Sequence, residues 1–128
     1  MTPEVPFVYS PALRAKLGEY RALNRLPAPI ADLVFPLLIV PPPKDRDPES
    51  GRKPTLEEIV HFTGARIGRY WPLRLAMLDT RCLFSAFGEM NCTEWLPRLF
   101  SVARSSNARV IPVMTLEDIV GVRGDAFS

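Results

Sequence analysis

Four charged side chains follow the first and third apolar segments of the chain, where an α/β protein often carries its chemistry. They are Lys16, Glu19, Asp79 and Arg81. Lys16 could hold an anion, Glu19 or Asp79 could act as a general base, and Arg81 could stabilise developing charge. These four are the candidate catalytic residues. The alternative interpretation is a solvated rim in which Lys16 and Glu19 are first-turn helix residues.

The same argument extends to the other apolar segments, because ligands of parallel βα proteins bind at the carboxyl ends of the strands. If all four segments join one sheet, their ends converge on one rim. That rim would also carry Lys44, Asp45 and Arg46 after the second segment, and Thr115 and Glu117 after the fourth.

A second kind of candidate is an aromatic pair in a basic neighbourhood. Tyrosine and tryptophan are enriched at the anchor points of protein interfaces, and nearby arginines would suit an acidic protein surface or a nucleic-acid backbone. Burial of the aromatic pair in the core is the alternative. The candidate interaction residues are Tyr70, Trp71, Arg66, Arg69, Arg74, Lys44 and Arg46.

Several classes of site find no support in the sequence. There is no glycine-rich phosphate loop and no zinc spacing, and His61 is the only histidine. Cys82 and Cys92 are too few for a disulfide framework and indicate reduced thiols. We therefore predict no cofactor and no metal, and we leave catalysis uncertain and less expected than binding.

Composition indicates one globular domain of 128 residues, 47% hydrophobic and 23% charged. No apolar run has the length of a membrane helix, and we identify no secretory signal. The net charge of +2 is weaker than the bias of a dedicated nucleic-acid binder. These features lead us to expect a cytoplasmic protein without a membrane partner.

The apolar pattern predicts strands that alternate with helices. Within the predicted strand 32–40 apolar residues do not alternate with polar ones, which is typical of a parallel strand covered on both faces. Thr55 and Glu58 form a capping box that opens a helix. Gly64 and Gly68 indicate either close packing or a frayed helix end. The predicted strands are 7–13, 32–40, 72–79 and 108–114; the predicted helices are 16–26, 55–71, 93–105 and 115–120, with 80–91 as a link.

This order predicts an α/β fold of four βα units with a mostly parallel sheet, resembling half of a (βα)8 barrel. We expect a single domain over 1–128. Within it, 41–54 should form an exposed loop and 121–128 a flexible tail.

Two stretches resemble the phage beta-protein family. Residues 9–23 contain a tyrosine–proline strand followed by Lys16 and a Gly-Glu-Tyr helix, and residues 35–42 run into a double proline. The similarity is strongest over residues 9–42, and Ile39 stands where members usually have a glutamate. The resemblance implies a phage or prophage origin and a barrel-like βα architecture.

Three functions remain open at this point. The first is a small phage-type protein-interaction module that inhibits a bacterial host or defence complex, with a bacterial or phage protein as its partner or a homodimer that covers the open sheet edges. The second is a small-ligand-binding or enzymatic barrel fragment that uses the rim. The third is a nucleic-acid-binding accessory protein, which predicts steep salt dependence.

Overall fold

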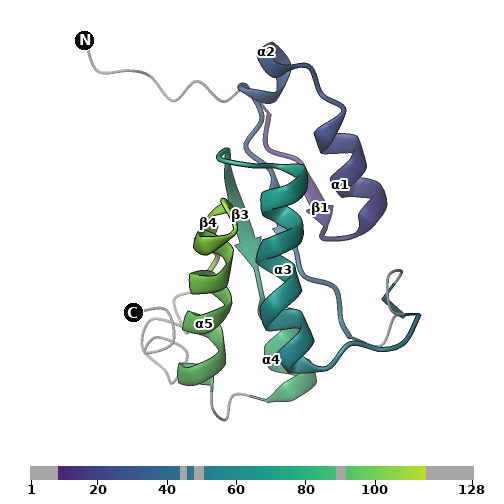
Figure 1. Ribbon diagram of the computed structural model, residues 1–128, viewed down its shortest axis with the longest axis vertical. Coiled ribbons are helices and arrows are strands. Elements are labelled where there is room, and N and C mark those ends of the chain that lie inside the picture. Colours follow the sequence, from purple (N-terminus) through teal and green to yellow (C-terminus); the bar gives the residue numbers. More distant parts are fainter. Residues whose placement is uncertain (1–8, 44–45, 48–50, 89–91, 115–128) are drawn as a thin grey trace.

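The computed structural model describes residues 9–43, 46–47, 51–88 and 92–114, which form an α/β fold with a four-stranded parallel sheet (Figure 1). The strands lie in chain order, β1-β2-β3-β4, so the predicted fold class, a half-barrel-like arrangement of βα units, is confirmed. In order, the elements are β1 (Ala12–Arg14), α1 (Leu17–Asn24), α2 (Ala28–Ala31), β2 (Leu37–Ile39), α3 (Leu56–Tyr70), β3 (Leu75–Asp79), α4 (Arg81–Phe87), α5 (Cys92–Ser105) and β4 (Arg109–Pro112).

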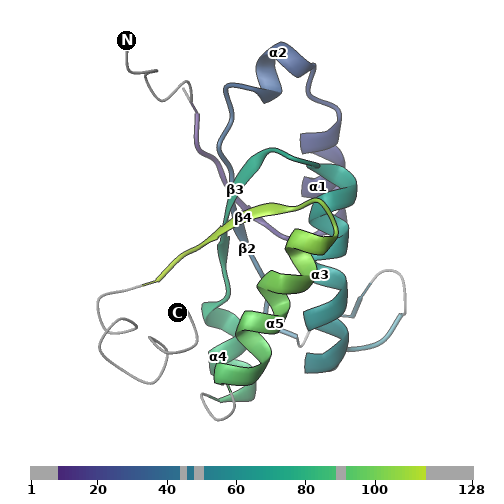
Figure 2. The same ribbon diagram turned by 60° about the vertical axis from the view of Figure 1, so that its left-hand side comes forward.

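The register of the sheet separates its two faces. Leu13, Leu38, Leu78 and Pro112 lie side by side across the four strands. Leu38 and Leu78 in this row are completely buried, because the row faces the helices. Sequential strand order with right-handed crossovers places successive connections on one side of a sheet, and Figure 2 shows α1, α3 and α5 together on that side.

Close packing of α3 against α5 holds the helix layer together. Gly64 lies so near α5 that a Cβ added to it would stand 2.7 Å from the backbone nitrogen of Ala103. Gly68 lies even closer to its neighbour, the backbone of Ser106. The two glycines are therefore packing positions, not signs of a frayed helix end. Near them in the sequence, Ile67 and Trp71 belong to the buried core.

Prolines make the strands shorter than predicted. The first strand was placed at 7–13, but the regular ladder begins only after Pro11, and Tyr9 makes an isolated bridge to Val34. The second was placed at 32–40, but only Leu37–Ile39 is regular, since Pro36 and Pro41 flank it. Proline lacks the N–H that a ladder needs, which explains both corrections.

The helical predictions need three corrections. The segment 80–91 was taken as a link, yet Arg81–Phe87 forms α4. A short helix, α2, follows Pro27, where we predicted only a helix stop. The helix predicted at 93–105 begins at Cys92, which places Pro97 inside it and beyond its first turn. The capping box of Thr55 and Glu58 is confirmed. The helix predicted at 115–120 and the tail at 121–128 lie outside the described residues.

Candidate functional site

Asp79 and Arg81 form a paired unit at the carboxyl end of β3. The Asp79 carboxylate accepts hydrogen bonds from the Arg81 backbone N–H at 3.0 Å and from the guanidinium Nη2 at 2.6 Å. Burial of Asp79 favours the neutral acid, but the hydrogen bonds and charge of Arg81 outweigh it and hold the pKa of Asp79 below its usual range. The carboxylate is ionised and fully engaged, as expected of a structural ion pair at the start of α4.

Lys16 lies at a different place, at the carboxyl ends of β1 and β2. It precedes α1, and its carbonyl accepts the N–H of Tyr20. It lines a cavity of about 140 Å³ together with Arg46, whereas Glu19, Asp79 and Arg81 do not line this cavity. The structure therefore divides the predicted rim into an Asp79–Arg81 pair and a Lys16–Arg46 cavity. Lys44, Asp45, Thr115 and Glu117 fall outside the described residues.

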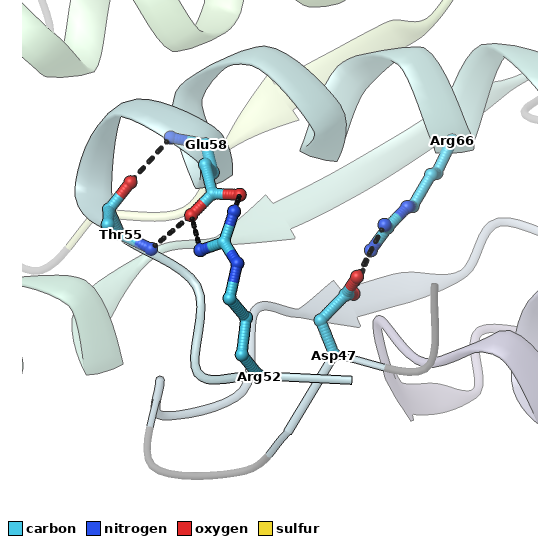
Figure 3. Close-up of polar contacts among 5 residues, drawn as sticks. All are labelled: Asp47, Arg52, Thr55, Glu58 and Arg66. Carbon is cyan, nitrogen blue, oxygen red and sulfur yellow. Dashed lines mark hydrogen bonds and ion pairs between the residues drawn. The ribbon is translucent and has the colours of Figure 1, made fainter. Parts of the chain in front are cut away.

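The β2–α3 loop, residues 40–55, is tied to α3 by an ion pair whose two residues line this cavity. Asp47 accepts two hydrogen bonds from the Arg66 guanidinium, at 2.6 and 3.1 Å, and both side chains are largely buried (Figure 3). The guanidinium carbon of Arg66 also lies 3.7 Å from the centre of the Phe62 ring. Within a loop expected to be exposed, Asp47 is thus a buried anchor.

A second ion pair fixes the end of the same loop. Both carboxylate oxygens of Glu58 accept from Arg52, at 2.6 and 2.7 Å, while one of them also accepts the Thr55 N–H (Figure 3). The Thr55 hydroxyl accepts the Glu58 N–H in return. Hydrogen bonds from Arg52, together with those of Thr55, hold the pKa of Glu58 below its usual range. These hydrogen bonds join this end of the loop to the first turn of α3.

The predicted aromatic and basic cluster does not form one exposed patch. Trp71 is 2% exposed and donates its indole N–H to the Leu75 carbonyl. Arg74 lies over the Trp71 ring and pairs with Asp32, at 2.9 Å.

The remaining aromatic of the cluster faces another helix. Tyr70 stacks on Tyr20 with ring centroids 5.7 Å apart, and Arg69 lies over its ring. Trp71 is a core residue, and Arg66, Arg69 and Arg74 each make a separate contact within the chain.

Asp47 and Arg52 are the residues of this region that sequence reasoning did not single out. The capping box indicated where the loop rejoins α3, but no spacing rule connects Asp47 to Arg66, nineteen positions away. The alternating charges of the loop were the available signal. However, the same charges are just as compatible with an exposed, solvated loop as with ion pairs to α3.

The face of the sheet opposite the helices carries an apolar strip, and no helix of the described residues packs over it (Figure 2). Register places Leu37, Met77 and Ile111 in one row of this face. Leu75 and Ile111 are 38% and 43% exposed, which is high for large aliphatic side chains in a sheet. We call the strip formed by Leu37, Ile39, Leu75, Met77 and Ile111 the open face.

Basic side chains flank the open face. Arg14 of β1 is aligned with Ile39 of β2, and Arg109 of β4 is aligned with Leu75 of β3. Both arginines therefore lie on this face, and both are exposed. Asp79 shares it too, but its charge is matched by Arg81. The open face therefore combines an apolar centre with net positive flanks.

The outer edge of β4 is blunted by a proline. Val113 donates its N–H to the Leu78 carbonyl, so in a parallel ladder the odd-numbered residues of β4 turn their backbone groups toward β3. Val110 and Pro112 then turn theirs toward the outer edge, where Pro112 has no N–H to offer. Proline in this orientation is typical of a strand that remains at the edge of its sheet.

Two other classes of site were sought among the described residues. In the part of the chain that the structure describes, no three histidine, cysteine or acidic side chains gather as they would around a metal ion. No helix in that same part is long and apolar enough to cross a bilayer.

Comparison with known proteins supports the resemblance noted in the sequence. The family model described as "Beta protein" matches residues 9–124, which is far more of the chain than the 9–42 stretch that carries the visible motifs. No curated protein and no solved structure gave a match. Since the match covers most of the chain, and the sheet has the parallel βα plan that the resemblance implied, the chain belongs to the Beta protein family, a family of phage-type proteins.

Proposed function

We propose that this phage-type chain is a protein-interaction module that binds a bacterial or phage protein through the open face. The observation that carries the proposal is the apolar strip of the open face, with Leu75 and Ile111 as its most exposed side chains and arginines at its flanks. Apolar patches rimmed by polar residues are typical of protein interaction sites. The partner would belong to a host or defence complex in the bacterial cytoplasm. By binding there through the open face, the module would cover a working surface of that complex and so inhibit it.

Charge selects the kind of partner. Arg14 and Arg109 on the flanks favour an apolar ridge, such as one side of a helix, bordered by carboxylates. A second copy of the chain would bring arginines against arginines, and Pro112 would leave a gap in any parallel pairing at the β4 edge. Both features favour an acidic partner over a homodimer.

The test is capture of a partner by matched surface variants. Tagged wild-type chain, Leu75→Asp, Ile111→Asp and the control Ile30→Asp are each incubated with bacterial lysate. Ile30 is an aliphatic residue on α2 that is even more exposed than Leu75 and Ile111, and it lies away from the open face. We expect one stoichiometric protein to bind the wild type and the Ile30 variant, and to be lost with both open-face variants.

The salt dependence of binding and the mass of the protein in solution complete the test. Binding should weaken as ionic strength rises, because the flanking arginines contribute to recognition. Capture that Leu75→Asp and Ile111→Asp leave intact would contradict the proposal. A symmetric dimer in sizing and mass measurements, dissociated by the Ile111 variant, would replace the foreign partner with a second copy. Nucleic acid in the bound fraction would favour the nucleic-acid-binding alternative.

A further inference from the structure

The outer edge of β1 differs from that of β4, because its backbone groups are open to pairing. The carbonyl of Pro11 accepts the N–H of Leu37. Ala15 donates its N–H to the carbonyl of Ile39. In a parallel ladder the residues between these positions turn their backbone groups the other way. Those outward residues are Ser10, Ala12 and Arg14. Among the residues that the structure describes, none accepts a hydrogen bond from their N–H groups.

Pro11 does not interrupt this edge. Its nitrogen faces β2, where a donor to the Phe35 carbonyl is missing. The Ser10 hydroxyl supplies that donor, at 2.6 Å. Pro11 is therefore accommodated on the inner side of the strand, whereas Pro112 of β4 removes a donor from the outer side. The sheet has one blunted edge and one open edge.

The helix that follows β1 leans away from the open edge. Tyr20 of α1 stacks on Tyr70 of α3, and the Asn24 side chain donates to the Tyr70 carbonyl at 3.1 Å. These contacts draw α1 toward the centre of the helix layer. Ala12 and Arg14 remain exposed. An exposed strand edge of this kind is a template for pairing with another strand.

We infer that the outer edge of β1 pairs with β1 of a second copy, in antiparallel orientation about a twofold axis at Ala12. Antiparallel pairing of two identical strands is symmetric, so both copies contribute the same residues. Ala12 would lie opposite its own copy, where two methyl groups fit on the axis. Ser10 of each copy would lie opposite Arg14 of the other. Each of these pairs would exchange two backbone hydrogen bonds.

Charge selects this register over its neighbours. A twofold axis perpendicular to the sheet leaves the Arg14 side chains of both copies on the same face. With Ala12 on the axis, the two arginines are separated along the ladder by about 14 Å. This separation exceeds the Debye length of about 8 Å at physiological ionic strength, so their repulsion is screened. A shift that placed Arg14 on the axis would set the two guanidinium groups side by side.

The inferred pairing closes on itself. It uses the open edge of both copies and leaves only the two β4 edges, each blunted by Pro112. Two four-stranded sheets would join into one, and the product would be a dimer, not a fibre. The open faces of both copies would lie on the same side of this sheet, and neither would be covered. The inference is therefore independent of the proposed function, because the objections to self-association at the open face and at β4 do not apply to β1.

Sedimentation equilibrium of the purified full chain tests the inference. A single strand from each copy makes a small interface, so the protein concentration is raised to about 1 mM. Wild type should reach twice the mass of one chain in this range. Ala12→Pro removes the outward N–H on the axis but no bond to β2, and it should weaken dimerisation about tenfold or more. The control Ala12→Val keeps the N–H and should dimerise like the wild type.

Three results would overturn the inference. The first is a wild type that stays monomeric at about 1 mM. The second is a dimer that Ala12→Pro leaves intact. The third is a dimer that Ile111→Asp dissociates, because Ile111 lies on the open face and not at the β1 edge. A dimer that Ile111→Asp preserves supports pairing through β1, whether or not the same variant loses a foreign partner.

Disulfide formation tests the register without the proline variant. The background is Cys82→Ser, which removes the partly exposed native thiol and keeps the buried Cys92. With oxidised glutathione, Ala12→Cys should give a covalent dimer, because the Cα atoms of a hydrogen-bonded pair are about 5.5 Å apart. Arg14→Cys should stay without a cross-link, since its two copies lie about 14 Å apart. Cross-linking at position 14 and not at position 12 would contradict the inferred register.

Discussion

Gly64 on α3 and Ala103 on α5 are in backbone-to-backbone contact, with no room for a side chain at Gly64. A methyl group there would overlap the Ala103 backbone, which can yield only if the two helices separate. We expect Gly64→Ala to lower the free energy of unfolding by about 3 kcal/mol. Chemical denaturation of wild type and variant measures this change in unfolding free energy.

Gly18 provides the matched control for that substitution. It lies in the first turn of α1, and a Cβ added to it meets nothing within 4 Å. Alanine restricts the unfolded chain more than glycine does, so Gly18→Ala should raise stability by about 0.5–1 kcal/mol. An equal rise in stability from the two substitutions would show that they act through helix propensity alone and not through the α3–α5 contact.

Removal of Asp47 should release the β2–α3 loop from α3. Asp47→Ala leaves the Arg66 guanidinium, 17% exposed, without this carboxylate. We expect a loss of about 2–4 kcal/mol in unfolding free energy. Amide hydrogen exchange should also become faster at position 47, whose N–H donates to the Arg52 carbonyl, and at Gly51, whose N–H donates to the carbonyl of residue 47.

The exposed pair of Arg98 and Glu57 is the reference for that change. Its atoms are also 2.6 Å apart, but both side chains are half or more exposed. Arg98→Ala should therefore change stability by less than about 0.5 kcal/mol. If the two substitutions had equal effects, burial of the Asp47–Arg66 pair would not be what makes it stabilising.

Asp79 should make stability depend on pH in the acid range. Its pKa in the folded state lies below the ordinary value of 3.8. Below that value the unfolded chain binds the proton more readily, so the stabilisation present at neutral pH is lost as pH falls through the folded pKa. Asp79→Asn should cost about 1–2 kcal/mol at pH 7.

The difference in unfolding free energy between wild type and Asp79→Asn should decrease as the pH falls. Urea unfolding of wild type and Asp79→Asn from pH 7 to pH 3 should give curves that converge below about pH 4, as Asp79 becomes protonated. A constant difference across this range would mean that the ion pair with Arg81 does not depress the pKa of Asp79.

The capping box offers a test of the loop's second attachment. The Thr55 hydroxyl accepts the N–H of Glu58 at 3.2 Å. Thr55→Ala should lower stability by about 1 kcal/mol, and Thr55→Ser, which keeps the hydroxyl, should stay near the wild type. The melting temperatures of the two variants in thermal unfolding measure this difference. Equal melting temperatures for both variants would argue against a capping role.

The fold could be predicted from the sequence wherever local patterns decide it. The continuous apolar run before Pro41 indicated a buried parallel strand, and the Thr55–Glu58 spacing marked the start of α3. Boundaries failed where two local signals competed. The apolar run predicted a longer β2 than its flanking prolines permit. At Arg81–Phe87 the apolar residues are too few for helical periodicity to be recognised.

The candidate sites could be predicted less well, because they depend on contacts between distant segments. Sequence showed that Lys16 follows one strand and Asp79 another, but not that Asp79 would be occupied by Arg81, two positions away. The arginines around Trp71 had the right charge for an interaction surface. Packing placed Trp71 in the core and gave Arg66 to Asp47, and only the three-dimensional structure reveals that partner.

Pro112 has a consequence for the behaviour of many copies of the chain in one cell. A sheet with an unpaired edge strand invites neighbouring molecules to extend it into fibres, and an exposed apolar face would help to hold them there. At the outer edge of β4, an incoming strand would meet a missing N–H at Pro112, the last residue of the strand. Recognition of a partner and resistance to self-polymerisation can therefore coexist in the same small sheet, since one resides in its face and the other in its edge.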